Sequence, residues 1–289
     1  MRKAIAAIFI AMFAVVFVLG CTGAKKEEAG AGAGYTLTVN PQEVMTEGVS
    51  TFDLRITNPF EVKMANVHVT TPEISLPYTV DGRITTDGTD ILPGQTYPVL
   101  MTLSIPKDAF GELSNKNIQV CFNYKTNYYY DVAKKSKTGT ETFSTSQGQT
   151  SGPIKVSASG LDTLYIENKK ATGSITVTND WQGSIEKINS ITTTVPAGLS
   201  GGIELKIGST CTATATTGNV ELKADSTNKE DPCKILFNKG VIASGLTVVA
   251  TENTPEGATV GVDRVQGTID YDYCYKILIP TITIKTVPQ

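Results

Sequence analysis

The chain has 289 residues, of which 40% are hydrophobic and 18% are charged, and its formal net charge is −3. The hydrophobic content is too high for a disordered chain, and the near balance of charge argues against a nucleic-acid binder. With His68 as its single histidine, the chain cannot build a metal site from several histidines. Threonine occupies 41 positions, and a composition rich in threonine, valine and isoleucine favours strands over helices.

The first 20 residues have the layout of an export signal. Arg2 and Lys3 precede an apolar run from Ala4 to Gly20, which is at the lower edge of the length that spans hydrocarbon. This pattern predicts a signal helix over residues 1–20 whose cations stay in the cytoplasm while the rest of the chain is exported.

The end of the signal predicts how the protein is anchored to the membrane. Val18-Leu19-Gly20-Cys21 resembles the lipobox of exported lipoproteins, which implies cleavage before Cys21 and a lipid on its sulfur. The alternative is that Cys21 ends an uncleaved signal anchor. Both interpretations place the protein at the cell surface, on the outer face of the cytoplasmic membrane. The segment 21–34 is rich in glycine and alanine and predicts a flexible linker.

From Tyr35 onward the chain alternates apolar and polar residues in short runs, such as Phe52–Ile56 and Ile282–Ile284. Turn signals of the types Asn-Pro, Asp-Gly and Pro-Gly separate these runs. Period-two alternation with β-branched residues is typical of half-buried strands. The sequence therefore predicts an all-β body.

The two halves of the body resemble each other. Three segments recur in the same order, which predicts a duplicated domain of ordinary size. A polar stretch at Thr142–Pro153 separates the halves, so we expect domains at 35–150 and 151–289. The matching segments are Leu54–Phe60 with Ile175–Trp181, Asn66–Pro72 with Asn189–Pro196, and Phe122–Tyr124 with Tyr271–Tyr273.

Each half carries an apolar-x-apolar-x-Asn strand end, and in the first half Pro93-Gly94 and an alternating strand at Val99–Leu103 follow. This pattern resembles the immunoglobulin-like modules of prokaryotic, particularly archaeal, cell-surface proteins, such as the CARDB-like and S-layer-associated domains. The resemblance implies two tandem immunoglobulin-like β-sandwiches with adhesive, spacing or assembly roles. It offers no catalytic residues.

Four further cysteines in an exported chain suggest disulfides. Cys211 and Cys233 flank a polar insertion in the second domain, and we expect them to pair and contribute roughly 3 kcal/mol. Cys121 and Cys274 lie in corresponding strands of different predicted domains. We expect them to be buried thiols, unless one pairs with another cysteine of the second domain. The wide spacings argue against zinc.

Tyrosines are the most unusual feature of the body. Tyr271, Tyr273 and Tyr275 share one face of a predicted strand, and Tyr128 and Tyr129 belong to a second cluster. One interpretation is that they pack against a sheet with their hydroxyls at its rim. The other is an aromatic strip that contacts glycan or protein, since tyrosine is enriched at interfaces.

The remaining polar candidates are weak. His68 alternates with Val67 and Val69, which predicts an exposed strand residue. Asp81-Gly82 and the segment Asp87–Asp90 fit tight turns better than a calcium loop, although their oxygens suit Ca²⁺. We therefore predict neither a metal nor a cofactor.

These features together predict a non-enzymatic surface lipoprotein with an adhesive, structural or assembly role in the cell envelope. The alternative is a binding module or accessory subunit that captures glycan or protein through its tyrosine-rich strands. The expected partners are the membrane, through the N-terminal lipid or signal anchor, and an unknown surface protein or glycan. Nucleic acid is not expected.

Overall fold

The computed structural model describes residues 34–71, 73–74, 77–82, 88–223, 233, 246–251 and 260–286. The described chain is all-β, as predicted. Among the described residues, the helical element of more than one residue is a short 3₁₀ turn, η1 (Ile166–Asn168). The predicted signal helix at 1–20 and Cys21 lie outside the described residues. Within the described ranges, no helix is long and apolar enough to cross a membrane.

Two sheets are built mainly from the first part of the chain, and β20, from the end of the chain, joins the smaller one. The larger one has the antiparallel order β1-β3-β7-β5, and alternate residues of β3 (Phe52, Leu54 and Ile56) are fully buried, as the period-two pattern predicts. The smaller sheet has the order β2-β20-β8. The strands are β1 (Tyr35–Asn40), β2 (Glu43–Met45), β3 (Val49–Thr57), β5 (Thr79–Gly82), β7 (Thr96–Ser104), β8 (Gly111–Leu113) and β20 (Ile282–Lys285).

A five-stranded sheet follows in the second part, with the order β11-β13-β18-β15-β16. Its first three strands are antiparallel and repeat the arrangement of β1, β3 and β7. The first pair of matching segments lies largely in β3 and β13, which occupy the same place in their sheets. The strands are β11 (Ile154–Ser159), β13 (Lys170–Asn179), β15 (Gly202–Ile207), β16 (Cys211–Ala215) and β18 (Leu246–Thr251).

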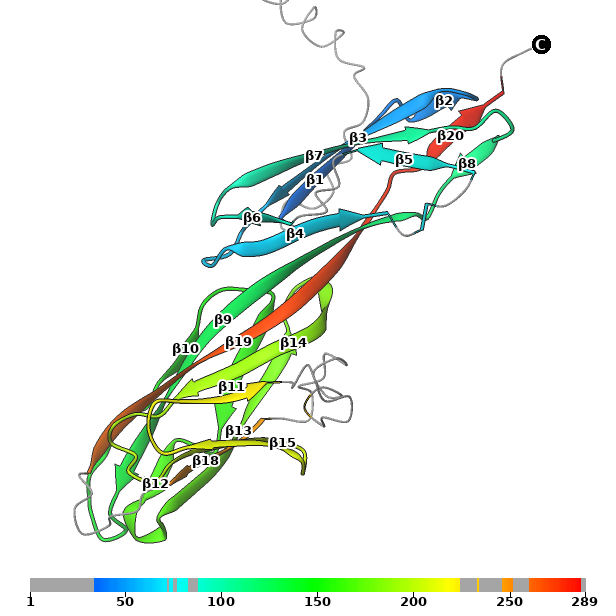
Figure 1. The fold of residues 1–289 in the computed structure, drawn as a ribbon. Helices are drawn as coiled ribbons and strands as arrows, with labels where there is room; N and C mark the ends of the chain where they lie inside the picture. The colour runs from blue at the N-terminus through cyan, green and yellow to red at the C-terminus, as the bar shows by residue number, and fades with distance from the viewer. Residues whose placement is uncertain are drawn as a thin grey trace, which may run out of the picture.

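The largest sheet has eight strands and runs through both parts of the molecule. Its order is β17-β14-β19-β9-β4-β6, and β10 and β12 also pair with β9. Figure 1 shows β9 and β19 as two long strands, side by side, that connect an upper group of strands to a lower one. The strands are β4 (Met64–Thr70), β6 (Thr89–Ile91), β9 (Asn117–Lys135), β10 (Gln147–Gln149), β12 (Thr163–Tyr165), β14 (Gly183–Thr194), β17 (Asn219–Lys223) and β19 (Gly261–Leu278).

The pairing of β9 with β19 is continuous, from Gly261 opposite Lys134 to Leu278 opposite Asn117. We call this pair the ribbon. Strand pairing therefore crosses the predicted boundary near residue 150, because β20 joins β2 and β8 while β12 joins the far end of β9. The division into 35–150 and 151–289 stays a prediction, with the last strands of the chain paired to the first part.

Candidate functional site

The middle of the molecule, which we call the waist, is built around the tyrosines of β19. Tyr271, Tyr273 and Tyr275 are almost completely buried. Tyr275 stacks on Tyr35 of β1 with ring centroids 5.9 Å apart, and it meets Trp181 of the β13–β14 turn edge-on at 4.7 Å. Rings from both parts of the chain therefore share one aromatic cluster, and burial of such large side chains strongly stabilises their contact.

Hydrogen bonds satisfy two of these buried hydroxyls. Tyr271 shares a hydrogen bond of 3.0 Å with the hydroxyl of Thr126 on the neighbouring strand. The Tyr273 hydroxyl donates to Asn179 Oδ1 at 2.7 Å and accepts from the Gly183 backbone N–H at 2.8 Å. Burial raises the pKa of Tyr273 to about 12, so this phenol stays neutral and keeps its proton for Asn179.

The predicted aromatic binding strip is therefore wrong for four of its five residues. Tyr271, Tyr273 and Tyr275 face the core because β19 is a central strand, covered on that side by the facing sheet. Tyr128 is also buried and shares a 2.7 Å hydrogen bond with a hydroxyl of β14. Tyr129, the next residue of β9, points to the opposite face and stays half-buried at the surface.

The structure contains two disulfides among the described residues. Cys211 and Cys233 are bonded, as the sequence predicted. Cys121 and Cys274 are also bonded, because the ribbon places them directly opposite each other. The expectation that these two are thiols of separate domains is wrong, since the register of two strands about 150 residues apart is not readable from either strand alone.

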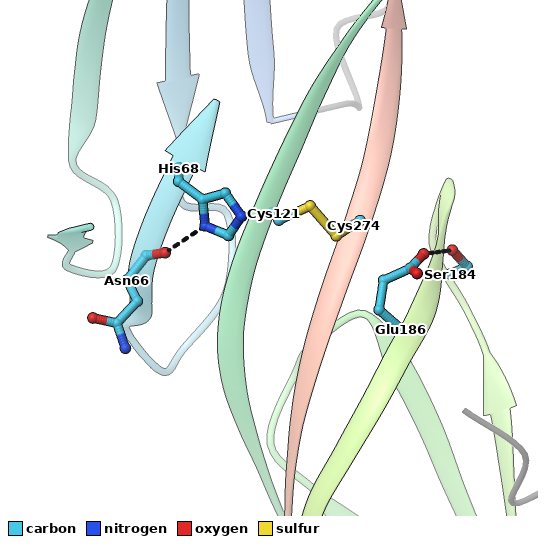
Figure 2. Close-up of a disulfide and its surroundings, with 6 residues drawn as sticks. All are labelled: Asn66, His68, Cys121, Ser184, Glu186 and Cys274. Atoms are coloured by element: carbon cyan, nitrogen blue, oxygen red, sulfur yellow. Dashed lines mark hydrogen bonds between the residues drawn. A yellow bond between two sulfur atoms is a disulfide. The ribbon is translucent and has the colours of Figure 1, made fainter. Parts of the chain in front are cut away.

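The disulfide of the ribbon lies beside His68, which is exposed as predicted (Figure 2). His68 sits opposite Cys121 in the β4–β9 pairing, and its Nδ1 is 3.2 Å from the backbone oxygen of Asn66. On the other side of the disulfide, Ser184 donates a hydrogen bond to Glu186. A hollow of about 410 Å³ is lined by His68, the two cysteines and Glu186, among others.

A polar network covers the same sheet face next to this hollow. Asn123 Nδ2 lies 2.7 Å from Asp270 Oδ1, and Asn189 Nδ2 lies 3.0 Å from Asp272 Oδ1. Lys125 forms an ion pair with Asp270. These contacts tie β9, β19 and β14 together, so the carboxylates are already used by neighbouring side chains.

The described ranges contain no group of three or more His, Cys, Asp or Glu side chains that could hold a metal ion. Among the carboxylates considered for Ca²⁺, Asp90 pairs with Lys63 at 2.6 Å. Asp87 lies outside the described residues.

Two ion pairs bind β9 to β19 at the lower end of the ribbon. Arg264 Nε donates to Asp131 Oδ1 at 2.8 Å, and Ser146 also donates to this carboxylate. The Arg264 hydrogen bond, with help from Ser146, lowers the pKa of Asp131 to about 2. Lys134, which is buried, lies 3.0 Å from Asp263. The ribbon is thus held along its length by a disulfide, an aromatic cluster and charge pairs.

Comparison with known proteins adds no identity. No protein-family model and no curated protein matches the chain. Among solved structures, it is similar to the secreted serine protease VesC from Vibrio cholerae at 10% identity and a TM-score of 0.21, over 87% of this chain and 52% of VesC. It is also similar to the collagen adhesin of S. aureus, at 10% identity and a TM-score of 0.13, over 86% of this chain and 91% of the adhesin. The chain spans about half the length of VesC, and TM-scores this low assign no function.

Proposed function

We propose that the chain is a non-enzymatic lipoprotein of the cell surface, anchored to the outer face of the cytoplasmic membrane through Cys21 or the signal helix. Its body consists of two immunoglobulin-like β-sandwiches, the first completed by the strands that end the chain. The body acts as a stiff spacer with an adhesive, structural or assembly role in the cell envelope.

The observation that supports the spacer role is the ribbon. A pair of strands continuous over 18 residues leaves no linker at which two domains could bend, unlike an ordinary tandem array joined by a flexible segment. The Cys121–Cys274 disulfide and the aromatic cluster further restrict motion at the waist.

The anchor is tested with the full chain in a prokaryotic host that processes lipoproteins. Mass spectrometry of the native N-terminal peptide should find it starting at Cys21 with the added mass of a lipid. Cys21→Ser should abolish that mass, while the neighbouring change Thr22→Ser should keep it. An intact Met1, or a native Cys21 without lipid, would contradict lipidation.

The stiffness of the body is tested with spin labels on cysteines introduced at two exposed aromatic positions. Phe110, beside β8, and Tyr165, in β12, lie in opposite parts of the chain. The ribbon predicts a single narrow distribution of distances between the two labels, measured by pulsed electron spin resonance. A broad or double distribution would refute the spacer.

A further inference from the structure

The outer face of the eight-stranded sheet has a second, larger hollow of about 560 Å³, far along the ribbon from His68. Ligand pockets commonly enclose ~300–1,000 Å³. Its lining comes from β9, β10, β14, β19, the start of β17 and Thr150, which follows β10. Every lining residue is an asparagine, glutamine, threonine, tyrosine or glycine. We call it the amide hollow, and its lining carries no charge.

Strand register arranges its side chains in two rows across the sheet. Tyr129, Gln266, Thr194 and Asn219 are successive partners and form the first row. Asn127, Thr268 and Thr192 form the second, two residues along each strand, and Glu221 of β17 lies opposite Thr192 at the end of this row. With strands about 4.8 Å apart, the four-strand row is ~14 Å long.

The two asparagine amides of these rows are oriented by their neighbours. The Thr268 hydroxyl donates to Asn127 Oδ1 at 2.9 Å, and the Thr194 hydroxyl donates to Asn219 Oδ1 at the same distance. Each asparagine thereby uses its oxygen inside the protein. Among the described residues, neither Nδ2 group has a hydrogen-bond partner, and neither does the amide of Gln266. The NH₂ donors of Asn127 and Asn219 are therefore held in place for an acceptor that comes from outside.

Tyr129 supplies an aromatic surface that is fixed in orientation. The guanidinium of Arg264 lies 4.3 Å from its ring centroid, and Asp131 in turn holds that guanidinium. A side chain at position 148 would meet the ring, because a Cβ on Gly148 would be 2.7 Å from Tyr129 Cε1. Arg264 and Glu221 lie outside the lining, so the side chains that line the hollow, the tyrosine among them, are uncharged.

We infer that the amide hollow binds a neutral glycan. Sugar hydroxyls accept from amide NH₂ groups and donate to amide and threonine oxygens, while the apolar face of a pyranose ring packs on a tyrosine. A phosphate, sulfate or uronic acid would find no cation in the lining. The site goes beyond the spacer role and does not depend on the lipid at Cys21.

The test uses the full chain, purified in a detergent without a sugar headgroup. Binding is measured by calorimetry against pentamers of mannose, glucose, galactose and N-acetylglucosamine, with oligogalacturonate as the charged probe. We expect at least one neutral pentamer to bind and oligogalacturonate not to bind.

Three variants assign the binding to the hollow. Tyr129→Ala removes the ring, and Asn127→Asp keeps the acceptor for Thr268 while removing the NH₂ donor. Each should weaken binding of the pentamer at least tenfold with an unchanged far-ultraviolet spectrum. Tyr165→Ala, at an exposed tyrosine outside the hollow, should leave binding unchanged.

The inference is overturned if no neutral pentamer binds at 10 mM, or if binding survives both changes in the hollow. Preference for oligogalacturonate over every neutral sugar would also overturn it, as would occupation of the hollow by a peptide in place of sugar. None of these outcomes bears on lipidation at Cys21 or on the stiffness of the ribbon, which have their own measurements.

Discussion

The two disulfides differ in the length of chain that they close, and this difference predicts how much each one stabilises the protein. Cys121 and Cys274 are 153 residues apart in sequence, whereas Cys211 and Cys233 are 22 apart. All four cysteines are buried to a similar degree. Replacing both members of one pair by alanine therefore truncates buried side chains in either case, and the loop length is the main variable.

Loop-closure entropy in the unfolded chain gives about 5 kcal/mol for the longer loop and about 3 kcal/mol for the shorter one. The shorter loop lies inside the longer one, but this nesting changes the larger value by only ~0.1 kcal/mol, because the dependence on length is logarithmic. Cys121→Ala/Cys274→Ala should thus reduce the free energy of unfolding by about 2 kcal/mol more than Cys211→Ala/Cys233→Ala.

The assay is guanidinium unfolding at pH 7, followed by the fluorescence of Trp181 and by circular dichroism. Coincident transitions establish two-state unfolding, and the midpoints then rank the two double variants. Equal losses of stability, or a larger loss from the Cys211–Cys233 pair, would refute loop closure as the source of the difference.

Two further predictions concern single positions. Gly267→Ala should lower the stability of the protein by about 1–3 kcal/mol, because the new Cβ would lie 2.4 Å from Tyr128 Cζ and 2.5 Å from Thr192 O. The control is Gly261→Ala, whose Cβ meets nothing within 4 Å and which should leave the melting temperature nearly unchanged in a thermal melt. Asp131 has a folded-state pKa of about 2, below its ordinary value of 3.8, so its stabilising effect is complete above about pH 5 and is lost as the pH falls towards 2. Between pH 5 and pH 2 the free energy of unfolding, measured with urea, should fall by about 1 kcal/mol more for the unmodified protein than for Asp131→Asn. The effect is this small because Arg264 is half-exposed, so solvent screens the ion pair. Parallel plots of unfolding free energy against pH for the two proteins would contradict this role.

The local patterns of the sequence were sufficient for the strands and for one disulfide. Alternation in β3 correctly predicted which of its side chains are buried, and the same argument placed His68 at the surface. Cys211 and Cys233 are close enough in sequence for one polar insertion to indicate their pairing. These inferences succeed because each depends on a few neighbouring residues.

Whether a face of a strand is buried or open to a ligand depended on contacts between strands that are distant in sequence. Alternation showed that Tyr271, Tyr273 and Tyr275 share a face, but only the covering sheet decided that this face is buried. The sequence also shows polar residues at alternate positions near Gln266. No local sequence pattern indicated that their neighbours in the sheet would be Asn127 and the threonines of β14.

The sequence by itself thus determined an all-β body with buried and exposed alternation along its strands. The tertiary structure alone decided the register of β9 with β19, and with it the Cys121–Cys274 disulfide, the buried aromatic waist and the amide hollow. The physical reason is that period-two alternation assigns side chains to two faces of a strand, while the pairing of strands some 150 residues apart is set by the packing of the whole molecule.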